Sequence, residues 1–259
     1  MARPLHVAVL TCGAHGYETA ADLARLSCVR RVTVVESENL RPRGTWRRLR
    51  LAYSRKGPWG LAVAVMRKVR PPAPERASPP DDYLRVRRFH DTDGLAALQA
   101  LGADLYVVDG TYILPESVFG IPELGTINLH CGYLPDVKGA PPVFWELYEG
   151  KASTGVSVHF VTADLDGGPI IARRRIGIDP APSGDPVEYA DRIWREVLRR
   201  EGIEMLAEAV GSLAKGQVET IHQSTGEGRV YLHPDYRTVR ALRRRVARRR
   251  KAPHLERED

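Results

Sequence analysis

The chain has 259 residues, of which 43% are hydrophobic and 27% charged, and its formal net charge at pH 7 is +7. This length and composition allow a substantial buried core, which excludes an intrinsically disordered protein. The longest strongly apolar run, Leu61 to Met66, is far shorter than the roughly 20 residues that a membrane-spanning helix needs. Three widely spaced cysteines favour neither a disulfide framework nor a zinc cage. Because the chain also opens without a signal-peptide pattern, we expect a soluble cytoplasmic protein.

The positive charge is confined to two segments. Nine Lys and Arg residues fall within 237–251 and ten within 41–70, and neither segment contains an acidic residue. The rest of the chain is therefore net acidic. A basic run of this kind can bind nucleic acid or an acidic membrane surface. It can also be the solvated face of a helix, and we favour that interpretation for both segments.

Strands and helices alternate over the first two thirds of the chain. A β-branched run, a helical stretch and a second β-branched run open it, which is typical of a βαβ unit with parallel strands. The expected strands are 6–11, 32–35, 83–88, 103–108, 124–129, 155–161 and 169–176, and the expected helices are 18–26, 92–101 and 142–149. Repeated βα units predict an α/β protein with a mostly parallel central sheet flanked by helices.

Two regions depart from this alternation. Residues 41–80 are expected to form a basic helical insertion that ends in a proline-rich loop, because PPAPERASPP cannot continue a helix or a central strand. From residue 185 apolar residues recur at helical spacing, and the arginine-rich segment closes the chain. We therefore expect a main domain over 1–184 and a helical C-terminal extension over 185–259 with an Arg-rich tail.

Three polar side chains occupy positions where a ligand is expected, because ligands of open α/β sheets bind beyond the carboxyl ends of the strands. Asn128 and His130 lie two residues apart at the end of one expected strand, so their side chains point the same way. Asp166 lies in the loop LDGGP, whose paired glycines permit a tight turn. An amide, an imidazole and a carboxylate could therefore converge, although each residue alone is more typical of an ordinary structural position.

The stretch that contains these residues resembles the signature of the folate-dependent formyltransferases. It reads INLHCGYLPDVKGAPPVFWELYEGKASTGVSVHFVTADLDGGPII. The matching elements follow in order, from Asn-x-His through Leu-Pro and a glycine to Thr-Gly-Val-Ser-Val-His and Leu-Asp-Gly-Gly-Pro-Ile, and Asp166 follows His130 by 36 residues. The resemblance implies a Rossmann-like formyltransferase fold with 1–184 as its catalytic domain. It also implies transfer of a formyl group from 10-formyltetrahydrofolate to an amine.

The resemblance assigns a role to each of the three side chains. Asn128 would donate a hydrogen bond to the formyl oxygen as that oxygen becomes negative, an interaction typically worth roughly 3–4 kcal/mol. His130 would handle protons or stabilise the same oxygen, because histidine changes its charge near neutral pH. Asp166 would orient His130 and relay protons through a bound water. This chemistry needs no metal, and the chain shows no metal-ligand spacing.

By the same resemblance, backbone groups would hold the pterin of the folate. Its walls would be Tyr112, Ile113 and Leu114 on one side and Val161, Thr162, Ala163 and Asp164 on the other. The apolar members of these walls are equally typical of an ordinary core. His159 matches part of the family and is interpreted as a structural residue. Cys131 replaces the family's usual proline, and without an indicated base partner it is not favoured as a nucleophile.

Departures from the family pattern bear on the acceptor. Glycinamide ribonucleotide enzymes carry Gly-Ser-Asn after the first strand, where this chain has Gly13-Ala14-His15, so that acceptor is less favoured. The tRNA enzymes carry a C-terminal β-barrel, whereas the pattern after Gly184 is mostly helical. We therefore expect a small-molecule amine, with an amino sugar nucleotide as the first candidate. The alternatives are a tRNA- or RNA-binding formyltransferase-like protein that uses the basic segments, and a formyltetrahydrofolate hydrolase.

Overall fold

The computed structural model describes residues 3–38, 79–224 and 226–251, so the basic insertion expected at 41–70 lies outside the described residues. The strands are β1 (Leu5–Thr11), β2 (Val29–Ser37), β3 (Tyr83–Val86), β4 (Leu105–Asp109), β5 (Thr126–His130), β6 (Val137–Gly139), β7 (Ser153–Phe160), β8 (Ile170–Gly177) and β9 (Arg229–Tyr231). The helices are α1 (His15–Leu23), α3 (Thr92–Leu101), α4 (Glu116–Phe119), α5 (Phe144–Glu149), α6 (Pro186–Ile193), the π-helix η1 (Trp194–Leu198), α7 (Arg199–Ala214) and α8 (Tyr236–Lys251).

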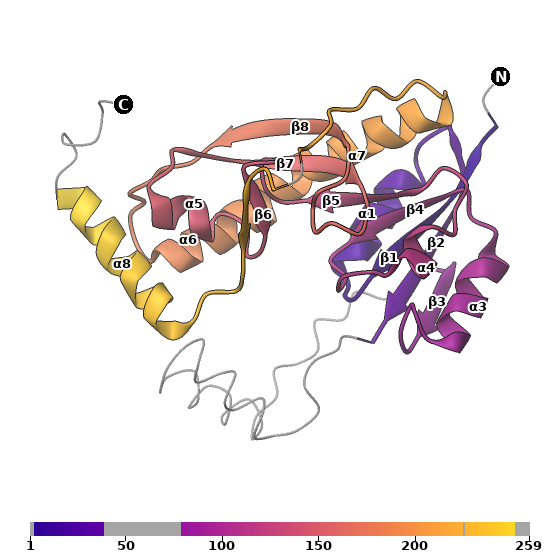
Figure 1. Ribbon diagram of the computed structural model, residues 1–259, viewed down its shortest axis with the longest axis horizontal. Helices are drawn as coiled ribbons and strands as arrows, with labels where there is room; N and C mark the ends of the chain where they lie inside the picture. The colour runs from indigo at the N-terminus through magenta and orange to yellow at the C-terminus, as the bar shows by residue number, and fades with distance from the viewer. Residues whose placement is uncertain (1–2, 39–78, 225, 252–259) are drawn as a thin grey trace.

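Seven strands form one sheet in the order β3-β2-β1-β4-β5-β7-β8. Neighbouring strands from β3 through β2, β1 and β4 to β5 pair in parallel. At the other edge, β7 pairs antiparallel with β5, and β8 pairs antiparallel with β7. The predicted mostly parallel sheet is therefore confirmed. Strands β6 and β9 pair separately as a small parallel sheet. Figure 1 shows β1 to β4 toward one end of the molecule and α5, α6 and α8 toward the other, with the long β7–β8 hairpin between them.

The central strands are apolar on both faces because helices cover both faces. Val7 and Val9 of β1 belong to a core cluster with residues of α1, α5, α6, α7 and α8. Ala8 and Leu10 belong to a second cluster with residues of α3 and α4. All seven residues of β1 are buried, which explains why the strand contains the apolar run 7–10 instead of an alternating pattern. The carboxyl ends of β1, β4 and β5 consequently lie at one shared edge.

The long helical pattern after residue 185 is confirmed as three consecutive pieces, α6, η1 and α7. Leu198, Leu206 and Val210 are buried in the same core cluster as the central strands. Gly202 lies so close to β5 that an added Cβ would stand 2.6 Å from a methyl carbon of Leu129. Helix α7 therefore packs directly on the sheet. The domain division after residue 184 remains a prediction.

A buried ion pair connects α7 to the end of β4. Arg199 Nη1 lies 2.8 Å from both carboxylate oxygens of Asp109, and Arg199 Nη2 donates to the His15 carbonyl at 2.8 Å. Thr19 on α1 also donates to Asp109, at 2.6 Å. Arg199 and Asp109 are only 7% and 4% exposed. The pair therefore fixes α1, β4 and α7 relative to one another at the edge of the sheet.

Helix α8 contacts the rest of the protein through both apolar and arginine side chains. Leu242 and Val246 are buried. Arg249 donates to the carbonyls of Leu147 at 2.6 Å and Tyr148 at 3.1 Å, where α5 ends. The basic side chains Arg237, Arg244, Arg248 and Lys251 are exposed. Part of the Arg-rich tail therefore docks the helix and part is a solvated face. None of the described helices is long and apolar enough to cross a membrane.

Neighbouring arginines of α8 should differ sharply in their contribution to stability. Arg249→Ala removes charge-assisted hydrogen bonds to the carbonyls of Leu147, Tyr148 and Pro180, so we expect it to lower the free energy of unfolding by about 1.5–3 kcal/mol. Arg248→Ala removes an exposed side chain and should change it by less than about 0.5 kcal/mol. Urea unfolding followed by circular dichroism measures both. Equal losses in the two variants would mean that the carbonyl contacts do not hold the helix.

Candidate active site

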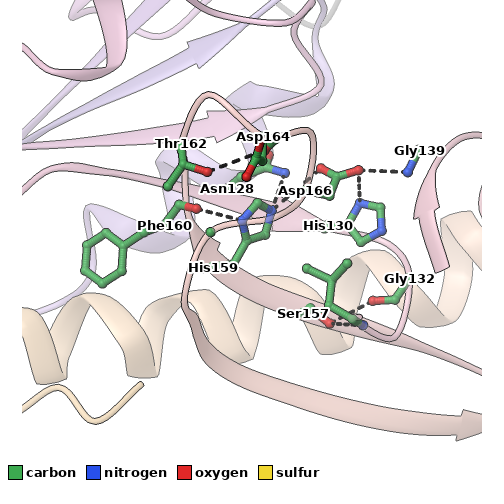
Figure 2. Close-up of polar contacts among 12 residues, drawn as sticks. Asn128, His130, Gly132, Gly139, Ser157, His159, Phe160, Thr162, Asp164 and Asp166 are labelled. Carbon is green, nitrogen blue, oxygen red and sulfur yellow. Dashed lines mark hydrogen bonds and ion pairs between the residues drawn. The ribbon is translucent and has the colours of Figure 1, made fainter. Parts of the chain in front are cut away.

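The antiparallel pairing of β5 with β7 brings two candidate residues together. Asn128 on β5 stands directly opposite His159 on β7 in the strand register. Asn128 and His130 both line one cavity, as expected for side chains two residues apart on a strand. Figure 2 shows Asn128, His130, His159 and Asp166 gathered around this point. The predicted convergence of amide, imidazole and carboxylate therefore exists in the folded chain.

Asp166 lies in the connection between β7 and β8, and backbone contacts from distant segments hold it. Its Oδ2 accepts a hydrogen bond from the Gly139 amide at 2.8 Å, and its carbonyl accepts one from Gln223 Nε2 at 3.0 Å. Its φ of 48° lies in the left-handed region, which is uncommon for a residue with a side chain. Gly168 closes the turn, and a Cβ there would stand 1.9 Å from the Phe160 carbonyl oxygen. The paired glycines are therefore a steric requirement.

The hydrogen bonds of His130 fix which of its nitrogens faces the cavity. Its Nε2 lies 2.9 Å from the Val137 carbonyl oxygen, which can only accept, so Nε2 carries a hydrogen. Its Nδ1 lies 3.6 Å from Asp166 Oδ2. Gly132 lies against this ring, and a Cβ on it would stand 2.4 Å from Nε2. The absence of a side chain at Gly132 therefore leaves room for the observed orientation of His130.

His159 is held as a neutral ring. Its Nδ1 lies 2.8 Å from the Phe160 carbonyl oxygen and therefore carries the hydrogen, so its Nε2 accepts from Asn128 Nδ2 at 3.1 Å. Burial is the main cause that lowers the pKa of His159 from 6.5 to about 4; the nearby His130 contributes to this shift, while Asp166 opposes it. The neutral imidazole fixes the Asn128 amide with its nitrogen toward His159 and leaves the second N–H of that nitrogen for another acceptor.

A cavity of about 300 Å³ contains all the residues expected to hold a ligand. Its lining includes Asn128, His130, Asp166, Tyr112, Ile113, Leu114, Val161, Thr162, Ala163 and Asp164. Ile113 is 72% exposed and Leu165 is 38% exposed at this cavity, so two apolar side chains face solvent at its walls. Exposed apolar side chains that line a cavity are suited to a flat apolar ligand. The exposure of Ile113 therefore excludes an ordinary core position for this residue, which is one of the two interpretations that its sequence allows.

Contacts with neighbouring segments hold the wall formed by residues 112–114. The Tyr112 hydroxyl accepts a hydrogen bond from the Phe89 amide at 2.7 Å, and the two rings lie 5.6 Å apart. At the start of the same segment, an added Cβ on Gly110 would stand 2.0 Å from His15 Nε2. Leu114 is buried. The segment is consequently held at both ends, while Ile113 between them faces the cavity.

Cys131 does not join the cavity lining. Burial raises the pKa of its thiol from 9.0 to about 12, which keeps it protonated and weakly nucleophilic at neutral pH. Among the described residues, no group of three or more His, Cys, Asp or Glu side chains has a metal-binding arrangement.

Sequence reasoning missed several groups that position the candidate residues. Gln223 gave no signal, because a lone glutamine far along the chain has no pattern that ties it to the DGG loop. The Val137 carbonyl and Gly139 amide are backbone groups, which any residue type supplies. The sequence favours a structural role for His159, because only the pairing of β7 with β5 places this residue opposite Asn128.

The chain belongs to the formyl transferase family, because the profile of that family matches residues 55–197, more than half of the chain. Among curated proteins, it is 36% identical to a methionyl-tRNA formyltransferase of Parabacteroides distasonis and 37% identical to one of Synechococcus. Both matches cover 140 residues, which are 54% of this chain and 41% of each relative. The match therefore spans less than half the length of these relatives.

Solved structures share the fold. A sugar N-formyltransferase from Shewanella superposes with a TM-score of 0.57 at 12% identity, over 88% of this chain and 76% of that one. Glycinamide ribonucleotide transformylase 1 from Symbiobacterium toebii superposes with a TM-score of 0.55 at 21% identity, over 84% and 94%. The predicted formyltransferase fold is thereby confirmed. At these identities the similarity concerns the fold alone.

The neutral state of His159 can be tested by titration. Because the folded ring binds a proton near pH 4 and an unfolded one near 6.5, we expect its imidazole NMR signals to show no protonation above about pH 5. The same difference predicts that stability falls as the pH drops from about 6.5 to about 4, since the unfolded chain then binds the extra proton. His159→Gln should lack this component of the urea-unfolding pH dependence. A ring that titrates near pH 6.5 would contradict the lowered pKa of His159.

Proposed function

We propose that this chain transfers a formyl group from 10-formyltetrahydrofolate to the amine of a small molecule. The convergence of Asn128, His130 and Asp166 in one cavity carries the proposal, and membership of the formyl transferase family supports it. The reaction joins the acceptor nitrogen to the formyl carbon and breaks the bond from that carbon to N10 of the folate. The acceptor nitrogen loses a proton, N10 gains one, and negative charge develops on the formyl oxygen between these events.

His130 is suited to take the proton from the acceptor amine. Its Nε2 is occupied by the Val137 carbonyl, so Nδ1 is the nitrogen that is free to accept. Asp166 Oδ2, 3.6 Å away, stabilises the ring once it is positive. That separation is longer than a hydrogen bond, and such contacts often shorten only when substrate is bound. A water between Asp166 and His130 could carry the proton onward.

Asn128 is suited to stabilise the negative formyl oxygen. One N–H of its amide is used by His159 Nε2, which fixes the amide plane and leaves the other N–H available. A donor held in place before the reaction stabilises developing charge without the cost of reorienting. The lowered pKa of His159 is important here, because a protonated ring would donate from Nε2 and displace the Asn128 amide. His159 is thus a positioning residue for Asn128.

The cavity fits the flat ring system that the donor presents. Its volume of about 300 Å³ and its exposed apolar wall residue Ile113 suit an aromatic heterocycle. The Tyr112–Leu114 and Val161–Asp164 segments contribute backbone amides and carbonyls with which a pterin edge can exchange hydrogen bonds. When bound, 10-formyltetrahydrofolate supplies the activated formyl group, and the chain's own residues supply orientation and proton transfer.

For the acceptor, we propose a small-molecule amine, with an amino sugar nucleotide as the first candidate. The fold likeness to sugar N-formyltransferases agrees with this choice. The residues described after 184 are mostly helical, and α7 packs against the central sheet, where its apolar residues are part of the main core cluster.

The names of the curated relatives favour methionyl-tRNA as the rival acceptor. Incubation with labelled formyl donor and either amino sugar nucleotides or charged initiator tRNA separates the two. Formate release without any amine would instead indicate a formyltetrahydrofolate hydrolase.

Substitution of the three candidate residues tests the mechanism. Asn128→Ala, His130→Ala and Asp166→Ala should each lower turnover by about a hundredfold or more, because each removes a group that acts on the developing charge or the proton. Circular dichroism should show an intact fold in all three. Near-normal turnover of a variant would remove its residue from the mechanism.

Donor binding can be measured before the acceptor is known. Calorimetric titration with a stable 10-formyl folate analogue should give micromolar affinity for the wild type. Asp166→Ala serves as the comparison, because the pterin walls remain while the carboxylate is lost. Absence of binding by the wild type at high protein concentration would rule out the proposed donor.

A further inference from the structure

A second cavity lies on the other side of the loop that carries Asp166. It has a volume of about 280 Å³ and lies among β6, the 164–167 loop and residues from 223–224 and 226–230. Asp164 and Leu165 line both cavities, so the loop separates the two spaces. Its polar lining comprises Lys138, Asp164, Gln223, Ser224 and Glu227. Neither the family signature nor the proposed reaction assigns this cavity a role.

Two buried polar side chains in this lining have unused hydrogen-bonding capacity. Lys138 is 6% exposed, and among the described residues no acceptor pairs with its ammonium group. Gln223 is 8% exposed; its Nε2 donates to the Asp166 and Gly168 carbonyls, but its buried Oε1 has no donor within the described part of the chain. A buried amide oxygen is costly when it lacks a partner, whereas the Lys138 ammonium is not a fully buried atom and is open to a ligand in the cavity.

The unused groups are complementary to one kind of ligand. Lys138 offers three N–H donors and a positive charge, which suit a carboxylate or a phosphate. Gln223 Oε1 requires an N–H or O–H donor. A compact anion with a neighbouring donor group satisfies both at once. The charge of Lys138 also contributes to the lowered pKa of His159, which places the ammonium near the catalytic groups.

We propose that this cavity is an anion-binding subsite, in which Lys138 and Gln223 hold a carboxylate or phosphate of one of the two substrates. That chemistry has two sources, the glutamyl end of the folate donor and an anionic group on the acceptor. The assignment of either source rests on the proposed formyl transfer, whereas anion binding by the cavity does not. Because Gln223 also holds the Asp166 and Gly168 carbonyls, an occupied subsite would stabilise the catalytic loop.

The test uses calorimetric titration of three proteins with three probes. The proteins are the wild type, Lys138→Met, which keeps the length of the side chain and removes its charge, and Lys215→Met. Lys215 is exposed at the end of α7 and does not line the cavity, so this variant controls for the loss of one positive charge. The probes are a 10-formyl folate analogue with its glutamate, the same analogue truncated to a neutral amide before the glutamate, and inorganic phosphate.

Two results would support the subsite and identify its source. If the donor fills it, Lys138→Met should weaken the glutamate-bearing analogue by about tenfold or more and leave the truncated analogue unchanged. If the acceptor fills it, Lys138→Met should bind both folate analogues with the affinity of the wild type. Inorganic phosphate should then bind the wild type and not Lys138→Met. In both cases Lys215→Met should behave like the wild type.

The subsite would be overturned if Lys138→Met bound all three probes within about twofold of the wild type, or if Lys215→Met weakened them equally. Failure of the proposed function is a separate result, because neither folate analogue would then bind the wild type while phosphate would still report on the cavity.

Thermal unfolding supplies an independent readout. Phosphate should raise the Tm of the wild type and Lys215→Met but not that of Lys138→Met. A phosphate-dependent increase in Lys138→Met would also contradict the proposal.

Discussion

The buried ion pair between Arg199 and Asp109 sets the geometry of the whole active-site edge. The guanidinium of Arg199, a residue that is only 7% exposed, is tolerated in the core because Asp109 and the His15 carbonyl accept its hydrogen bonds. Loss of either partner would leave an uncompensated charge in the core, so the three elements that meet there are held in one arrangement. Asp109 directly precedes the segment that begins at Gly110 and forms one wall of the candidate donor cavity. A contact made by α7 thereby determines where that wall stands.

The antiparallel addition of β7 to a parallel sheet is the second constraint on the site. It places His159 opposite Asn128, and the neutral ring then orients the amide. The hairpin from β7 to β8 also carries Asp166 back toward His130. The antiparallel direction of β7 therefore brings Asp166 close to His130, the proposed proton acceptor. It also brings His159 next to Asn128, which is proposed to donate a hydrogen bond to the formyl oxygen.

The 164–167 loop connects the two proposals. One side faces the cavity that contains Asn128, His130 and Asp166, and the other faces the cavity of Lys138 and Gln223. The loop is held by the Gly139 amide and by Gln223, which belong to the segments that line the second cavity. A ligand in either cavity would thus affect the position of the Asp166 carboxylate. The two spaces are complementary in chemistry, since the first is suited to a flat heterocycle and the second to an anion.

The sequence by itself determined the order and type of the longer elements, because β-branched runs, helical spacing and glycine turns are local signals, whereas the short elements β6, β9 and α4 gave no such signal. It also placed Asn128, His130 and Asp166 at the edge of a mostly parallel sheet, since side-chain direction on a strand and the position of strand ends follow from local pattern. Only the tertiary structure decided that β7 runs antiparallel beside β5, that Gln223 reaches the Asp166 loop, and that Arg199 closes on Asp109. These contacts join residues from 31 to 90 positions apart. Such pairings depend on how whole elements pack, and no local pattern in the chain encodes them.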